Sequence, residues 1–152
     1  MPVYSRRQWL TTVGSVALFP HLSTRAAEKE IRGAFIIMST PYTTGNQVDF
    51  DALAYQVDFL DRCGIHGLVW PQNSSEQRYL SKEERLQGFN VLAQAAKDKR
   101  PALFLGVQGN DTNDMLEYAR HAETLAPDGM IAIPPTEATT LAEFREYYAA
   151  LC

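Results

Sequence analysis

The chain has 152 residues, of which 45% are hydrophobic, and a formal net charge of −4. This acidic balance argues against nucleic acid or an anionic membrane surface as a partner. Its two cysteines, Cys63 and Cys152, do not make a disulfide framework, and three scattered histidines offer no metal-ligand cluster.

The N-terminus has the layout of an export signal. Arg6 and Arg7 form a pair that is followed by bulky apolar residues, and a modest apolar stretch then runs from Trp9 to Leu22. This stretch is too short and too polar to span a bilayer, which takes about 20 apolar residues. Thr24-Arg25-Ala26 offers a small-x-small cleavage site. The order of these features indicates a twin-arginine signal peptide, although a disordered leader with chance arginines is the alternative.

We therefore expect two segments, a removable signal at residues 1–26 and a mature domain at residues 27–152. Removal of the signal takes away three arginines and no acidic residue, so the formal charge moves from −4 to −7. The mature protein is then expected in the periplasm, with no membrane association.

Four short apolar runs predict β-strands. The runs are continuous rather than alternating, which favours parallel strands that are covered on both faces. They lie at residues 34–39, 67–70, 102–107 and 129–133.

A helix is predicted after each strand, with one apolar stripe. Asp49 is placed to cap the first helix, and capping boxes begin the second and fourth, with Ser81 and Glu84 in one and Thr140 and Glu143 in the other. The expected stripes are Leu53, Val57, Leu60 and Cys63; Leu86, Phe89, Leu92, Ala95 and Ala96; Met115, Tyr118, Ala119, Ala122 and Leu125; and Leu141, Phe144, Tyr148 and Leu151.

The repeated unit is βα at roughly 30 residues, which fits either a barrel or a doubly wound sheet. No glycine-rich turn follows the first strand, where a dinucleotide-binding sheet needs one, and a polar loop follows every strand. A closed (β/α)₈ barrel takes about 250 residues. The prediction is therefore an α/β fold that forms half of a TIM (β/α)₈ barrel, an incomplete barrel of four βα units with parallel strands.

An ordered series of short motifs resembles the N-terminal half of the dihydrodipicolinate synthase / N-acetylneuraminate lyase family. The resemblance begins at Gly33 and continues to the end of the chain, and no single motif is diagnostic. Its residues are Thr40-Pro41, Val48-Asp49, Ala52-Leu53, Gly64 to Val69, Ser75-Glu76, Leu80 to Arg85, Gly106, Gly109 to Thr112, Asp128-Gly129 and Pro134-Pro135.

This resemblance implies a class I aldolase or lyase that acts on a 2-keto acid such as pyruvate. In that family a lysine on a later strand forms a Schiff base and a tyrosine moves protons, so both would lie beyond Cys152, and no catalytic residue is expected in this chain. Lys82, Lys97 and Lys99 sit at helix ends on the solvated side and are not replacements. The resemblance also implies no metal or organic cofactor and a homo-oligomer, commonly a tetramer.

The family holds the keto-acid carboxylate with a Gly-Thr-Thr-Gly-Glu loop after its second strand. Ser74 matches the second threonine and Asn73 the first, so both are candidate carboxylate ligands. Asparagine cannot relay a proton as a hydroxyl does. The flanking glycines are replaced by Gln72 and Ser75, which leaves the backbone less freedom, and Glu76 is retained. The alternative is a polar surface loop with ordinary turn chemistry.

Two further positions concern aromatic hydroxyls. The synthases carry a tyrosine pair after the fourth strand, but here Glu137 stands in that region, so the synthase proton relay is in doubt. Tyr147 and Tyr148 are expected in the core rather than as substitutes. Tyr42, just past the first strand, is an additional candidate ligand contact, with an exposed loop aromatic as the alternative.

Three functional hypotheses remain open. The chain is part of an exported keto-acid aldolase or lyase that other residues complete; or the parent is a barrel that keeps a binding or structural role without the chemistry; or the chain is a half-barrel that pairs with another copy to close the ring.

Overall fold

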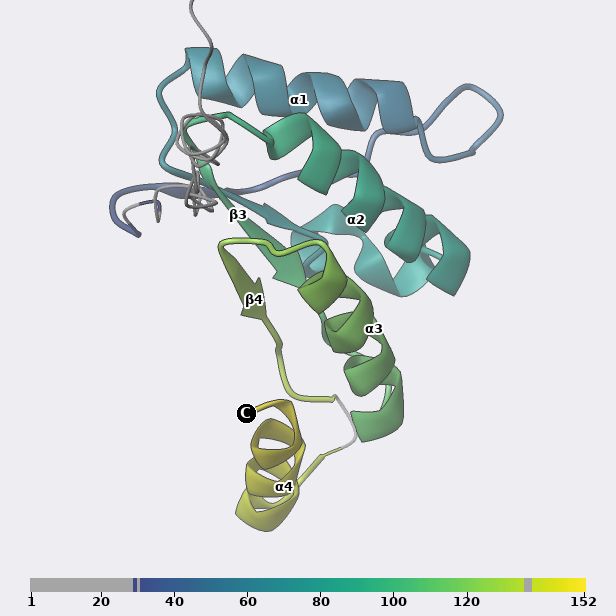
Figure 1. Cartoon of the computed structure of the whole chain (residues 1–152). Helices are drawn as coiled ribbons and strands as arrows, with labels where there is room; N and C mark the ends of the chain where they lie inside the picture. Colours follow the sequence, from purple (N-terminus) through teal and green to yellow (C-terminus); the bar gives the residue numbers. More distant parts are fainter. Residues whose placement is uncertain (1–28, 30, 136–137) are drawn as a thin grey trace, which may run out of the picture.

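The computed structural model of the protein describes Lys29, residues 31–135 and residues 138–152, so the expected signal and Glu137 lie outside the described residues. Within the described part, four strands form one parallel sheet in the order β1-β2-β3-β4 (Figure 1). This confirms the predicted repeat. The strands are β1 Phe35–Ile37, β2 Gly67–Trp70, β3 Ala102–Gly106 and β4 Gly129–Ile131.

A helix follows each strand, and the predicted N-caps are present. The Asp49 carboxylate accepts from the Ala52 N–H at 2.9 Å, and both predicted capping boxes are formed. Two short 3₁₀ turns, η1 and η2, lie between β2 and the second helix. The bounds are α1 Phe50–Arg62, η1 Asn73–Ser75, η2 Gln77–Tyr79, α2 Lys82–Ala96, α3 Thr112–Thr124 and α4 Leu141–Leu151.

The core lies between the sheet and the helices that cover one of its faces. Trp70 on β2 is fully buried and meets Phe89 on α2 edge-to-face, with ring centroids 6.3 Å apart. Gly88 makes this contact possible, since a Cβ there would come within 2.3 Å of the Trp70 ring. Leu68, Leu103 and Leu105 point to the same side and join the same cluster. The helices therefore pack against every second residue along the strands.

The other sheet face carries the remaining strand residues. Phe35 and Phe104 pack edge-to-face there, with centroids 5.2 Å apart, over the space that Gly67 leaves. Ile37 and Ile131 are 46% and 37% exposed. In a closed barrel this face would be the interior.

Three residues that were predicted in the core are exposed. Cys63 is exposed, because it caps α1 beyond the last turn that packs on the sheet. Tyr148 is 37% exposed and Leu141 is 64% exposed, although Tyr147 is buried as expected. The reason is that α4 packs against α3 and the β3–α3 loop on one flank, and no described element covers its other flank.

Candidate functional site

The two candidate carboxylate ligands lie where β2 ends. Asn73 and Ser74 form the first part of η1, and both are exposed at the edge of the sheet that carries the carboxyl ends of the strands. In α/β barrels the active site is built at this end. Their position agrees with the sequence-based expectation, while their role as ligands stays a prediction.

Ser75 holds this turn in place through buried hydrogen bonds. It is fully buried, and its hydroxyl donates to the Met38 carbonyl at 2.6 Å and accepts from the Gln72 N–H at 3.1 Å. The Thr40 hydroxyl donates to the Ser75 carbonyl at 2.6 Å and accepts from the Trp70 indole N–H at 3.0 Å. The turn after β2 is thus tied to the loop after β1 by buried hydrogen bonds, which lose little strength to solvent.

Two buried side-chain amides, of Gln72 and Gln108, connect the same turn to the loop after β3. The Gln72 side chain donates to the Gln108 side-chain oxygen at 3.0 Å, and Gln108 donates to the Pro71 carbonyl at 2.9 Å. Gly106 allows the close approach, since a Cβ there would lie 1.8 Å from the Pro71 oxygen. Gln72 therefore braces the turn that carries Asn73 and Ser74.

Arg85 supports the β3–α3 loop and was not predicted as a buried residue. It is 4% exposed, and its guanidinium donates to the carbonyls of Gly106 and Gln108 at 3.0 and 2.8 Å. The same group lies 3.7 Å from the centroid of the Tyr118 ring. Burial lowers the pKa of Arg85, and the nearby Tyr118 and then the Asp114 carboxylate offset part of that effect.

Tyr42 lies close to the retained glutamate. Its side chain is 39% exposed, and burial, followed by the nearby carboxylate of Glu76, raises the pKa of the phenol. Glu76 itself adopts the left-handed region at φ 58°, which completes the turn.

A cavity of about 300 Å³ opens between the loops that follow β2, β3 and β4. It includes Asn73 but not Ser74. Arg78 is the one cation among the described residues that line it, and sequence reasoning missed this residue because an exposed arginine in a polar loop has no distinctive spacing. The lining residues are Asn73, Gln77, Arg78, Gln108, Gly109, Asn110, Ile133, Pro134 and Pro135.

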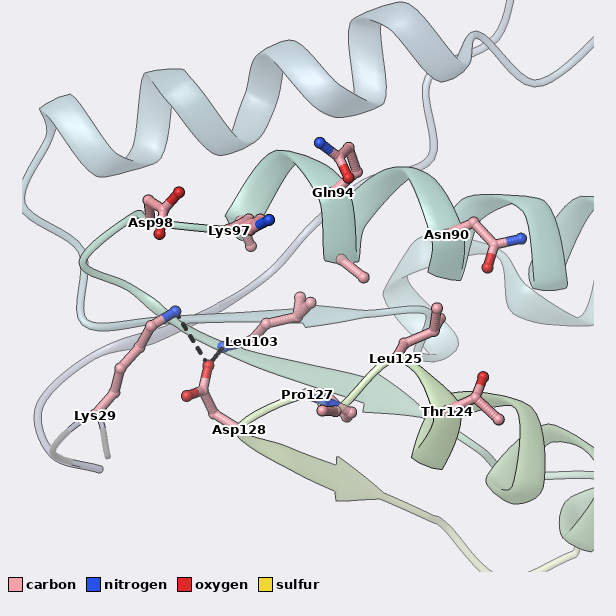
Figure 2. Close-up of a pocket in the computed structure, with 13 residues that line it drawn as sticks. Lys29, Asn90, Gln94, Lys97, Asp98, Leu103, Thr124, Leu125, Pro127 and Asp128 are labelled. Carbon is pink, nitrogen blue, oxygen red and sulfur yellow. Dashed lines mark hydrogen bonds and ion pairs between the residues drawn. The ribbon is translucent and has the colours of Figure 1, made fainter. Parts of the chain in front are cut away.

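A larger cavity, of about 650 Å³, lies at the opposite end of the sheet (Figure 2). Two of its charged groups hold the fold together: Lys29 pairs with Asp128 at 3.2 Å and donates to the Pro101 carbonyl, and Asp128 accepts from the Leu103 N–H. This cavity lies beside the starts of the strands. In barrel enzymes residues at that end contribute to stability, and the active site lies at the other end, so the larger volume does not make this cavity the candidate site.

The three lysines at helix ends, Lys82, Lys97 and Lys99, lie on the surface as expected. Lys99 pairs with Asp58 at 2.6 Å, Lys82 pairs with Glu117, and Lys97 is exposed. The described residues contain no group of three or more His, Cys, Asp or Glu that could hold a metal ion. None of the helices in the described part of the chain has the length and apolarity that crossing a bilayer demands.

Comparison with known proteins points to one family. The sequence pattern of the dihydrodipicolinate synthetase family matches residues 30–152. An uncharacterised DapA-like lyase of Pyrococcus abyssi is 27% identical over 106 residues, which cover 69% of this chain and 35% of that protein. A 4-hydroxy-tetrahydrodipicolinate synthase of Phenylobacterium zucineum is 32% identical over 104 residues, covering 68% and 35%. The chain thus spans about a third of these relatives.

Solved structures share the fold. A dihydrodipicolinate synthase crystal structure aligns with a TM-score of 0.74 at 25% identity and covers 79% of this chain and 41% of that chain. A prophage protein of the dihydrodipicolinic acid synthase family from E. coli K12, solved in complex with pyruvate, aligns with a TM-score of 0.75 at 24% identity, covering 80% and 41%. The four βα units match part of such a barrel.

Proposed function

The chain belongs to the dihydrodipicolinate synthetase family, and on this premise we propose that the whole protein is a Schiff-base (class I) aldolase or lyase that acts on a 2-keto acid such as pyruvate. In this proposal the chain supplies the carboxylate-binding turn. The lysine that forms the imine and the tyrosine that moves protons come from sequence beyond Cys152. The names of the relatives, a lyase and a synthase, support the reaction class.

The observation that carries the proposal is the anchored turn at the end of β2. Buried hydrogen bonds through Ser75 and Gln72 hold its backbone, while Asn73 and Ser74 stay exposed. The Ser74 hydroxyl and the Asn73 amide can each donate to a carboxylate. Because the fold already holds these two donors in place, less entropy is lost when the substrate is positioned beside the amine that forms the imine.

The lysines of this chain do not supply that amine. The Lys99 ammonium donates to Asp58, and this hydrogen bond raises the pKa of Lys99, which disfavours the neutral nucleophile. We therefore expect borohydride to trap no pyruvate adduct on this chain. A whole protein that includes the closing strands should yield one.

A second candidate is a barrel that binds a 2-keto acid without transforming it. The favouring observation is Asn73, whose exposed amide stands where the synthases use a hydroxyl to relay protons. Borohydride trapping on the whole protein separates the two, because a binding module without the imine-forming lysine gives no adduct.

The proposal also includes location and assembly. We propose that residues 1–26 direct the protein through the twin-arginine route to the periplasm. The whole protein is proposed to be a homotetramer with a small-molecule 2-keto acid as its partner and no metal or organic cofactor.

Pyruvate binding tests the carboxylate turn directly. Addition of pyruvate to the chain should shift the amide NMR signals of Asn73 to Glu76. Ser74→Ala should weaken binding by roughly 10- to 150-fold, because a hydrogen bond to a charged group is worth about 1.5–3 kcal/mol. Pyruvamide, which lacks the carboxylate, is the matched control and should give no such shifts. Equal responses to both compounds would rule out carboxylate recognition.

A further inference from the structure

The loop that follows β3 is held by one buried cation. Arg85 lies in the first turn of α2, which the capping box of Ser81 and Glu84 fixes, and it is 4% exposed. One terminal nitrogen of its guanidinium donates to the carbonyls of Gly106 and Gln108, at 3.0 and 2.8 Å. The start of a helix thus sets the backbone of a loop that lies beyond the end of the next strand.

Gln108 extends this constraint to the turn after β2. While its backbone carbonyl accepts from Arg85, its buried side chain donates to the Pro71 carbonyl at 2.9 Å and accepts from the Gln72 side chain at 3.0 Å. Gln72 is the N-cap residue of η1, and Asn73 follows it directly as the first residue of that turn. A short path of buried hydrogen bonds therefore leads from Arg85 to the backbone of Asn73, and water competes little with any of them.

The path joins two parts of the lining of one cavity. Gln108, from the loop after β3, and Asn73, from the turn after β2, both line the cavity of about 300 Å³. A separate buried hydrogen bond from Ser75 ties the same turn to the segment after β1. Loss of the path through Arg85 should therefore move Asn73 relative to Gln108, while the bond from Ser75 keeps the turn folded.

A buried guanidinium is a demanding group for the fold to hold. The Nε–H of Arg85 has no hydrogen-bond partner among the described residues, and an unpaired buried N–H lowers stability. The guanidinium carbon lies 3.7 Å from the centroid of the Tyr118 ring, which orients the group toward the two loop carbonyls. The fit of Arg85 is therefore to the geometry of the loop and not to stability alone.

We propose that Arg85 is a positioning residue of the site. Acting through Gln108 and Gln72, it sets where Asn73 lies relative to the loop after β3, and with it the affinity of the turn for a 2-keto acid. Arg85 itself is not among the residues that line the cavity, so it acts without touching the ligand. The inference rests on the proposed function for the identity of the ligand, whereas the path of hydrogen bonds is independent of it.

Arg85→Lys in the 152-residue chain tests the path without a ligand. The variant keeps the charge, but its ammonium lacks the planar fork and falls about one bond short of the two carbonyls, so the amide NMR signals of Gln72 and Asn73 should shift. Leu92→Ala, at a fully buried position on the same helix and outside the path, is the matched control. It should lower the melting temperature but leave these signals in place. Unshifted signals in Arg85→Lys would overturn the proposal.

Pyruvate titration of the same variants, below their melting temperatures, measures the consequence for binding. Arg85→Lys should weaken binding roughly tenfold, about the loss of one charge-assisted hydrogen bond, whereas Leu92→Ala should bind as the wild type does. A purely structural role would change the melting temperature and not the affinity, so equal affinities of Arg85→Lys and wild type would overturn the proposal. A wild type that binds no pyruvate contradicts the proposed function instead, and the ligand-free NMR comparison then decides on Arg85.

Chemical rescue gives a second variant. Arg85→Ala leaves a space beside two carbonyls and the Tyr118 ring, which matches the shape of a guanidinium ion. Millimolar guanidinium should restore the wild-type signals of Gln72 and Asn73, whereas urea, which is planar but uncharged, should not. Restoration by both compounds alike, or by neither, would overturn positioning by a buried cation.

Discussion

Ser74 and Ser75 are neighbours in the sequence, but they have different physical roles. Ser74 is exposed at the rim, whereas Ser75 is fully buried and hydrogen-bonded to Met38 and Gln72. A buried polar group that loses its partner costs more than the hydrogen bond contributed, since its partners are then desolvated and unpaired. The stability of this turn thus depends on the buried serine rather than on the exposed one.

The paired substitutions Ser75→Ala and Ser74→Ala test this division. Ser75→Ala leaves the Gln72 N–H and the Met38 carbonyl without their partner and should lower the free energy of unfolding by about 1–3 kcal/mol. Ser74→Ala, at an exposed position, should change it by less than about 0.5 kcal/mol. Urea unfolding at matched protein concentrations measures both. Equal losses for the two variants would contradict the assignment of Ser75 as the anchor.

At the scale of the element, α4 depends on its N-terminal capping box. The Glu143 carboxylate accepts from the N–H groups of Thr139 and Thr140 at 2.8 Å each, while the Thr140 hydroxyl accepts from the Glu143 N–H. The hydrogen bond from Thr139 and then that from Thr140 lower the pKa of Glu143 from its ordinary value of 4.5. Because α4 has one uncovered flank, its own first turn matters more than in a helix packed on both sides.

The capping box makes α4 sensitive to acid. A carboxyl group whose pKa is lower in the folded state stabilises the fold above its unfolded pKa, and this contribution is lost as the pH falls through the lowered value. The gap in melting temperature between wild type and Glu143→Gln should therefore be present at pH 7 and shrink below about pH 4. Glu146→Gln, one turn further along α4, is the control. A gap that does not change with pH would contradict the role of the ionised cap.

At the scale of the whole molecule, the proposed function combines an export signal with an active site that strands beyond Cys152 complete. The proposed signal lies outside the described residues, and the proposal rests on the order of its charges, apolar run and small-x-small motif. The twin-arginine route usually carries folded proteins. Export and folding of this protein are thus expected to be coupled.

Conservative substitution of the paired arginines tests the export route. Arg6→Lys together with Arg7→Lys keeps the charge but removes the arginine pair, and it should abolish export of a reporter fused after residue 26. Arg25→Lys is the matched control and should be exported normally. The readout is the periplasmic fraction of the reporter. Undiminished export of the double variant would contradict the twin-arginine assignment.

The order of strands and helices could be predicted from the sequence, because it depends on local signals. Asp49 and the capping boxes at Ser81 and Thr140 act over three residues, and the continuous apolar runs predict parallel strands without reference to any partner. The family resemblance, carried by short motifs in a fixed order, is confirmed by the family match over residues 30–152.

What only the tertiary structure decided is which polar groups are buried and which apolar groups are not. The bond from Ser75 to Met38 joins residues 37 positions apart, and the bond from Gln72 to Gln108 joins residues 36 apart. Burial at such positions depends on how distant loops meet, which no local pattern encodes. The exposure of Tyr148 has the same origin, since a stripe indicates that a helix has an apolar face but not whether a neighbour covers it.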